Sequence, residues 1–157
     1  MVQPSVPGRS NRRAAKHARA DAVTAAPGSS ERMSRQATRN TAPEMEVRRH
    51  LHAAGLRYRV HTRPLPPLRR TADIVFRGAR VAVFVDGCFW HSCPEHGTAP
   101  VTNGEWWAAK LSRNVERDVD TDHQLTDAGW LVVRVWEHED PVVAAERVVR
   151  AVRSRQI

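Results

Sequence analysis

The sequence predicts a single α/β domain that follows a basic N-terminal arm. Four short apolar segments have the length and composition of strands, and three other segments carry apolar residues at helical spacing. Along the chain the order is a helix, three strands, a helix, a strand and a last helix, with no internal repeat. A chain of 157 residues suits one hydrophobic core of this kind and a tail.

The arm is expected over residues 1–30, which are rich in Pro, Ser, Ala, Gly and Arg and lack apolar periodicity. Such a segment buries too little surface to fold alone, so we expect it to be disordered. Residues 1–40 hold eight of the 25 Lys and Arg residues but two of the 17 Asp and Glu residues. This charge could neutralise nucleic-acid phosphates, or it could only keep the chain soluble. Residues 31–157 are expected to form the domain.

The first helix is expected over residues 42–54. Thr41 and Glu44 have the spacing of a capping box, and Gly55 ends the apolar pattern. The residues of that pattern are Met45, Val47, Leu51 and Ala54. Leu56, Tyr58 and Val60 then alternate with basic residues, which is typical of a strand with one buried face.

The later elements follow from similar patterns. Strands are expected at residues 72–76 and 81–85, joined as a hairpin at Gly78, and a fourth strand at residues 131–136. Between them a long helix is expected over residues 105–127, irregular around residues 118–122 and closed by Gly129. Its apolar residues are Trp107, Leu111, Val115 and Leu125.

The last helix is expected to begin after Asp140, with Pro141 in its first turn. Its predicted apolar face comprises Val142, Ala145, Val148, Val149 and Val152.

The sequence has no apolar run long enough to span a bilayer and does not begin like a signal peptide. We therefore expect a cytoplasmic protein that does not bind membranes. In that compartment Cys88 and Cys93 are expected to be reduced thiols or metal ligands rather than a disulfide.

Asp73 is the first candidate catalytic residue, because an ionised carboxylate within an apolar strand is costly unless it is paired or binds a metal. A salt-bridged or helix-capping aspartate is the alternative. Pairing of the two central strands would bring Asp73 close to Asp86 and to the last carbonyls of the second strand. Oxygen ligands of this kind suit Mg²⁺. His91 follows in the next turn, and an imidazole can move a proton at neutral pH, although a loop histidine is often structural.

A second metal site is indicated by two thiols and two imidazoles, a ligand set that suits tetrahedral zinc. These residues are Cys88, Cys93, His96 and His138. A closed site of this composition would be structural, tying the loop after the third strand to the end of the fourth. Large aromatic residues lie in the same region and could wedge into a DNA duplex or pack in the core. They are Phe89, Trp90, Trp106 and Trp107.

Seven motifs occur in a characteristic order: Thr41–Glu44, Ala72–Phe76, Gly87–His91, Glu105–Trp107, Arg113–Asp118, Gly129–Trp130 and Val135–Glu137. Together they resemble the very short patch repair (Vsr) endonucleases, which nick DNA beside T/G mismatches left by deamination of 5-methylcytosine. The resemblance implies a restriction-endonuclease-like fold, with a central mixed sheet flanked by helices, a catalytic Mg²⁺ and a structural zinc.

The same resemblance implies roles for individual residues. Asp73 and the Val85 carbonyl would hold Mg²⁺, His91 would activate the attacking water, and Glu44 would support the hydration of the metal. The aromatic residues that would enter the duplex beside the mismatch are Phe89, Trp90 and Trp107.

Two departures from the family pattern stand out. Asp86 replaces a second histidine and could serve as a second acidic metal ligand, and the zinc ligands after Cys88 differ in kind and spacing. We expect a monomer that acts on mismatched double-stranded DNA, with other repair proteins as potential partners. The alternatives are a nuclease of the same fold with another DNA specificity and a non-catalytic, zinc-containing DNA-binding protein.

Overall fold

The computed structural model describes residues 38–97 and 100–156, so the predicted arm lies outside the described residues. A four-stranded sheet forms the centre, in the order β1-β2-β3-β4. Its strands are β1 (Arg59–Thr62), β2 (Ala72–Phe76), β3 (Val81–Asp86) and β4 (Leu131–Trp136). β1, β2 and β3 are antiparallel neighbours, whereas β4 runs parallel to β3. The predicted mixed sheet and the predicted order of elements are confirmed.

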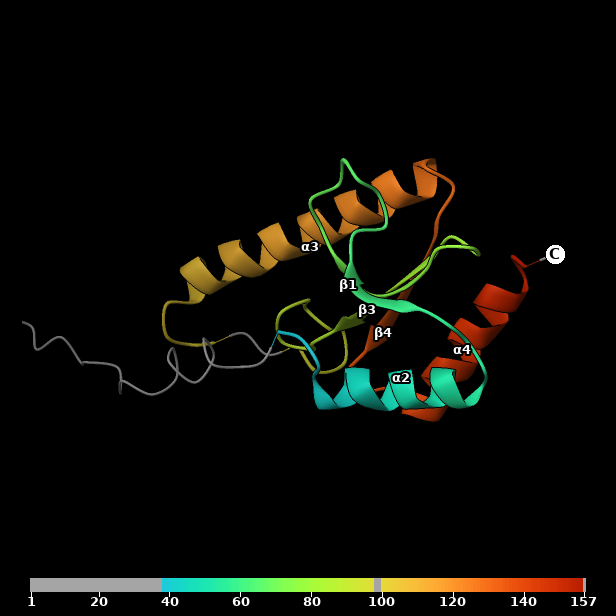
Figure 1. Ribbon diagram of the computed structural model, residues 1–157. Helices are drawn as coiled ribbons and strands as arrows, with labels where there is room; N and C mark the ends of the chain where they lie inside the picture. Colours follow the sequence, from blue (N-terminus) through green and yellow to red (C-terminus); the bar gives the residue numbers. More distant parts are fainter. Residues whose placement is uncertain (1–37, 98–99, 157) are drawn as a thin grey trace, which may run out of the picture.

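Helices cover both faces of the sheet (Figure 1). α2 (Ala42–Ala53) and α4 (Pro141–Arg153) pack together on one face, where Leu51 and Val148 meet strand residues such as Ile74 and Val83. α3 (Gly104–Asp127) lies on the other face, where Leu125 joins a smaller apolar cluster. No helix within the described residues is both long enough and apolar enough to cross a lipid bilayer.

α3 differs from the prediction in two respects. It is a continuous helix through residues 118–122, so the predicted irregularity is wrong. Of its side chains only Thr121 and Leu125 are buried, while Val115 is 37% exposed. The first half of α3 extends past the sheet, as Figure 1 shows, and therefore has no sheet residues to pack against. This overhang brings the N-terminal half of α3 next to the loop that follows β3.

Two other predictions are corrected at the ends of elements. The first strand begins at Arg59 rather than near Leu56, because Leu56 closes α2 by donating its N–H to the Leu51 carbonyl at 3.1 Å. In α4 the cap is as predicted, since the Asp140 carboxylate accepts the Val142 N–H at 2.8 Å. Val142 itself, however, is 44% exposed in the first turn, and Ala144 is buried instead.

Candidate active site

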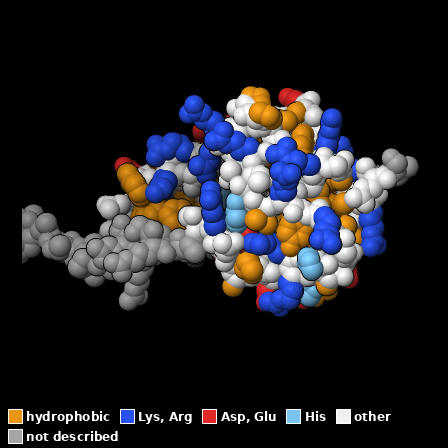
Figure 2. Space-filling model, in the orientation of Figure 1, with side chains coloured by type: hydrophobic (Ala, Val, Ile, Leu, Met, Phe, Trp, Pro, Cys, Tyr) orange, Lys and Arg blue, Asp and Glu red, His pale blue; other side chains and the backbone are white. Residues whose placement is uncertain are grey.

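The carboxyl end of β3, the loop after it and the overhanging part of α3 line a cleft of about 690 Å³. Its acidic residues are Asp73, Asp86, Asp118 and Glu137, and His91 lies among them. Its basic residues are Arg69, Arg70, Lys110, Arg117 and Arg134. Lys and Arg also predominate over Asp and Glu on the face drawn in Figure 2. An acidic cluster bordered by basic side chains suits a divalent cation and the phosphates of a nucleic acid.

Asp73 lies in β2 as predicted, and its Oδ2 accepts the Val85 N–H across the strand pair at 2.7 Å. Burial raises the pKa of Asp73 to about 6, although the hydrogen bond from Val85 opposes the increase. A half-buried carboxylate held in this way gains from a nearby cation. The structure thus places Asp73 beside the Val85 backbone through the Val85 N–H, whereas the family resemblance assigns the Val85 carbonyl to the metal.

Glu44 is buried and uses its two carboxylate oxygens for different partners. Oε2 accepts the Asn40 N–H at 2.8 Å, a contact that holds the start of α2. Oε1 lies 3.1 Å from Nε2 of His61 and 3.3 Å from Arg48. Glu44 can therefore cap α2 with one carboxylate oxygen and face His61 in the candidate site with the other.

His61 is a residue that the sequence reasoning did not single out. The register of β1 and β2 sets it opposite Asp73, and its Nδ1 lies 3.9 Å from Asp73 Oδ1. Its backbone has a φ of 49°, a conformation that non-glycine residues adopt rarely and that often marks functional sites. The imidazole thus lies between the carboxylates of Glu44 and Asp73.

Glu44, His61 and Asp73 each offer one ligand atom, and these atoms lie within 4.8 Å of one another. Ligands about 2.1 Å from an octahedral cation are separated by about 3.0 to 4.2 Å, so the group is compact enough to hold one. The two carboxylates suit Mg²⁺ or Mn²⁺, whereas an imidazole is a ligand for transition metals rather than for Mg²⁺.

His91 lies in the loop after β3, and its Nδ1 is hydrogen-bonded to Asp118 Oδ2 of α3 at 2.5 Å. Burial lowers the pKa of His91, but the hydrogen bond to Asp118 and the charges of Asp86 and Asp118 outweigh it, so the pKa is raised. For Asp118, burial raises the pKa, yet the His91 contact and the neighbouring cations leave it lowered. Asp118 thus fixes one ring nitrogen of His91 and leaves Nε2 for chemistry.

The His91–Asp118 contact predicts a pH-dependent contribution to stability. The lowered pKa of Asp118 stabilises the fold above its ordinary value of 3.8, and that contribution is lost at lower pH. The raised pKa of His91 stabilises the fold below its ordinary value of 6.5, and that contribution is lost as pH rises past the folded value.

Asp118→Asn should therefore lower Tm most between these two values, by roughly 3–8 °C. Thermal unfolding of both proteins from pH 3 to pH 8.5 measures the difference, and a deficit that is constant with pH would contradict the assignment.

Asp86 is buried at the end of β3, where Arg134 Nη1 donates to its Oδ2 at 2.8 Å. Burial raises the pKa of Asp86, and the charge of Arg134 opposes that increase. Asp86, His91 and Asp73 line the same cleft, as the sequence predicts. Asp86 is not part of the compact group formed by Glu44, His61 and Asp73 among the described residues.

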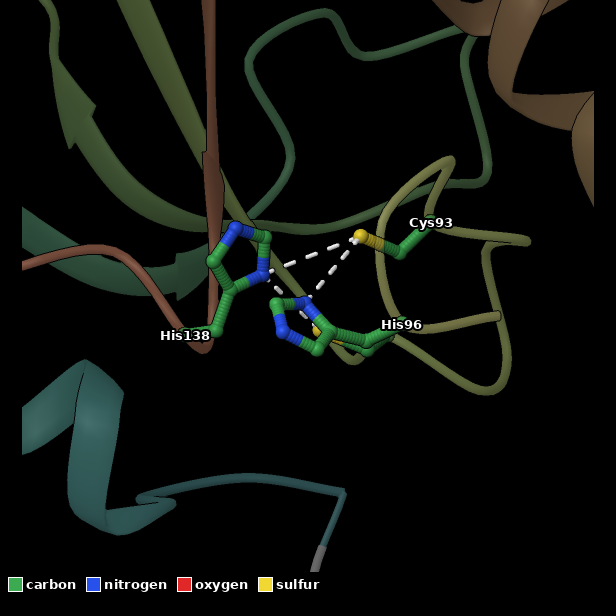
Figure 3. A group of neighbouring side chains, drawn as sticks. Cys93, His96 and His138 are labelled. Carbon is green, nitrogen blue, oxygen red and sulfur yellow. Dashed lines mark hydrogen bonds between the residues drawn. The ribbon is translucent and has the colours of Figure 1, made fainter. Parts of the chain in front are cut away.

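The four predicted zinc ligands come together: Cys88, Cys93, His96 and His138. Their ligand atoms all lie within 4.8 Å of one another, and Nδ1 of His138 lies 3.1 Å from Cys88 Sγ and 3.7 Å from Cys93 Sγ. Figure 3 shows His138, which follows β4, facing two residues of the loop after β3. Tetrahedral zinc with thiolate and imidazole ligands separates them by about 3.3 to 3.8 Å, so the set matches zinc in number and type. Cys93 Sγ lies 4.0 Å from His96 Nδ1, slightly beyond that range.

The local backbone supports this cluster. Gly97 donates its N–H to the Cys93 carbonyl at 2.8 Å, and a Cβ at Gly97 would lie 2.5 Å from that oxygen, so the turn requires glycine. Burial and the neighbouring Cys93 raise the pKa of the Cys88 thiol to about 11. Zinc would supply the positive charge that stabilises its thiolate.

The predicted DNA-contacting aromatics form one cluster. Phe89 lies 5.1 Å from Trp90 and 5.3 Å from Trp107, measured between ring centroids. Lys110 Nζ lies 5.3 Å from the Trp90 ring, and Trp106, which packs against Trp107, is 54% exposed. The aromatic cluster thus presents flat apolar groups and a positive charge next to the cleft. Trp107 packs among the other three aromatic rings of the cluster.

Comparison with known proteins identifies the family. A family model described as "DNA mismatch endonuclease Vsr" matches residues 20–97. The type II nicking enzyme V.NaeI of Lentzea aerocolonigenes is 46% identical over 144 residues, covering 87% of each chain. The chain belongs to the Vsr family of DNA endonucleases. The family resemblance predicted from the motifs is confirmed.

Other relatives differ in their stated activity. V.NmeDIP of Neisseria meningitidis serogroup C, a type II nicking enzyme, is 36% identical over 124 residues, covering 76% of this chain and 82% of that protein. The DNA mismatch endonuclease Vsr of Escherichia coli K12 is 38% identical over 105 residues, 64% of each chain. The three relatives are named as nicking enzymes or endonucleases. Of these three, the E. coli protein is named for mismatches.

Two of the seven motifs contain residues that contact the candidate site and that the sequence pattern alone did not assign to it. Asp118 ends the motif Arg113–Asp118, and Asn114 of the same motif donates to the Trp90 carbonyl at 3.1 Å. Glu137, which follows β4, accepts the Cys88 N–H at 2.7 Å. Each motif ends in an acidic residue, Asp118 or Glu137, and this was the sequence feature that could have indicated a role. The role itself depends on how α3 and β4 lie relative to the loop after β3.

Proposed function

We propose that the protein nicks one strand of duplex DNA beside a T/G mismatch produced by deamination of 5-methylcytosine. The observation that carries the hydrolytic part of the proposal is the His91–Asp118 pair in the same cleft as the half-buried Asp73, a cleft that basic side chains also line. A general base, a cation-binding carboxylate and phosphate-binding side chains are the parts that phosphodiester hydrolysis needs.

In this mechanism His91 Nε2 takes a proton from the attacking water, while Asp118 holds the opposite ring nitrogen and stabilises the imidazolium. Mg²⁺, held by Asp73 and the Val85 carbonyl, would neutralise the charge that develops on the phosphate. Glu44 would orient water around the cation, and His61 fixes Glu44 beside Asp73.

Two groups of residues would contact DNA, and a structural zinc would hold the loop that carries part of one group. Basic residues that line the cleft would contact phosphates, and Phe89, Trp90 and Trp107 would enter the duplex beside the mismatch. A structural zinc bound by Cys88, Cys93, His96 and His138 would fix the loop that carries His91 and both loop aromatics.

A nicking enzyme with another sequence or mismatch specificity is the second candidate. It is favoured by the similarity to V.NaeI, a type II nicking enzyme, which extends over most of both chains. The two candidates share the chemistry of the cleft and differ in the bases that they recognise.

Strand-labelled duplexes test the proposal. They carry a T/G mismatch in a cytosine-methylation context, the same mismatch in scrambled flanks, other mismatches, or matched pairs. We expect one Mg²⁺-dependent nick in the thymine strand, with roughly 10- to 100-fold preference over other mismatches. Equal or faster nicking of another duplex favours the second candidate, and tight binding without nicking favours the non-catalytic DNA-binding protein.

A further inference from the structure

Asp86 and Arg134 form an ion pair whose position follows from the sheet. Residues 84 and 86 share one face of β3 because side chains alternate along a strand. The parallel register sets Phe84 opposite Arg134, whose guanidinium lies 4.8 Å from the Phe84 ring centroid. The side chain then reaches Asp86, two residues further along β3, at 2.8 Å.

Arg134 also links the sheet to α3. Its Nε and Nη2 donate to the carboxylate of Asp122 at 3.0 and 2.8 Å, and Nη2 donates to the Asp118 carbonyl at 3.3 Å. One planar guanidinium with five N–H donors thus connects Asp86 of β3 with the turn of α3 that carries Asp118. Asp118 is the residue that holds His91.

The two oxygens of Asp86 are directed to two different partners. Oδ2 accepts from Arg134, and Oδ1 lies 3.7 Å from Nδ1 of His91. Asp86 is 4% exposed. A buried carboxylate held by a guanidinium has its charge already balanced and is a weak competitor for a further cation. Its other oxygen lies near the same ring nitrogen of His91 that is hydrogen-bonded to Asp118.

We propose that Asp86 is a positioning residue, which acts with Arg134 to hold the His91 ring so that Nε2 faces the cleft, and is not a metal ligand. This assignment rests on the proposed nuclease function, in which His91 is the base. Asp86, which replaces the family's second histidine, then acts through its ion pair with Arg134 and does not transfer a proton.

The test uses Asp86→Asn, Arg134→Met and the double variant, with Arg49→Met as the matched control. Arg49 pairs with Glu46 at 2.8 Å on the surface of α2, away from the cleft. Thermal unfolding of each protein checks that it folds, and Asp86→Asn, which keeps the side-chain shape, carries the test if Arg134→Met does not fold.

We expect Asp86→Asn to lower kcat roughly 10- to 100-fold with KM for DNA unchanged, because a misoriented base loses part of its effect. The half-maximal Mg²⁺ concentration should stay within about twofold of wild type, since no ligand is lost. The double variant should lose little more than the worse single variant, because the residues act as a unit. A tenfold rise in the required Mg²⁺, or independent losses that multiply, would overturn the proposal.

A second readout does not need catalysis. Long-range ¹H–¹⁵N spectra of the histidine rings should show a changed His91 ring in Asp86→Asn and Arg134→Met but not in Arg49→Met. An unchanged His91 ring in both variants would overturn the positioning role. If wild-type protein nicks no duplex, the proposed function fails, while these spectra still decide whether Asp86 and Arg134 position His91.

Discussion

Replacing Asp73 with asparagine is expected to reduce nicking by on the order of 10²–10³-fold while leaving DNA binding within a few-fold of wild type. The amide oxygen of asparagine can still accept the Val85 N–H, so the contact between β2 and β3 is kept. What is lost is the negative charge that holds a cation at the scissile phosphate. Single-turnover nicking and a mobility-shift titration measure the two quantities separately.

Asp127→Asn is the matched control, because Asp127 is exposed at the C-terminal end of α3 and outside the cleft. It should nick at the wild-type rate. If Asp73→Asn keeps most of the nicking activity, Asp73 does not hold the catalytic cation. If neither wild type nor variant nicks but both bind DNA, the non-catalytic reading gains support.

Replacing Cys93 with serine is expected to remove zinc and to lower stability by about 3–5 kcal/mol, a decrease in Tm of roughly 10 °C or more. Cys93 lies 3.7 Å from His138 Nδ1, so its loss would release the loop after β3 from the end of β4. Because that loop carries His91, nicking should fall as well.

Metal analysis of the purified protein and thermal unfolding with and without a chelator measure this effect. His52→Asn is the control, since His52 is an exposed histidine on α2 far from the cysteines in sequence and outside the metal-ligand group. Wild-type protein that holds about one zinc per chain and loses stability on chelation supports the structural role. Wild-type protein that takes up no zinc, with Tm insensitive to the chelator, would contradict it.

The zinc-ligand group and the order of elements could be predicted from sequence because their signals are local. Cys88, Cys93 and His96 lie within one loop, and His138 follows a strand whose pattern is clear. The parallel pairing of β3 and β4 then brings the two chain segments together. Asp73 was recognisable because a lone carboxylate in an apolar strand is unusual.

The contacts that organise the cleft were harder to predict. His61 and Arg134 are polar residues within strands, and the sequence pattern predicts that such residues face solvent. Arg134 instead contacts Asp86, 48 residues earlier, and Asp122, 12 residues earlier, across the sheet and α3. Such pairs depend on strand register and helix placement, which residue patterns along the chain do not encode. The exposure of Val115 has the same origin, because only the overhang of α3 beyond the sheet explains it.

The most direct test of Mg²⁺-dependent nicking at a T/G mismatch is a strand-resolved time course on a T/G duplex with the folded, zinc-loaded protein, at several Mg²⁺ concentrations. We expect a single nick in the thymine strand that needs Mg²⁺ and that Asp73→Asn slows without weakening binding. A protein that binds this duplex but leaves both strands intact at every Mg²⁺ concentration would contradict it.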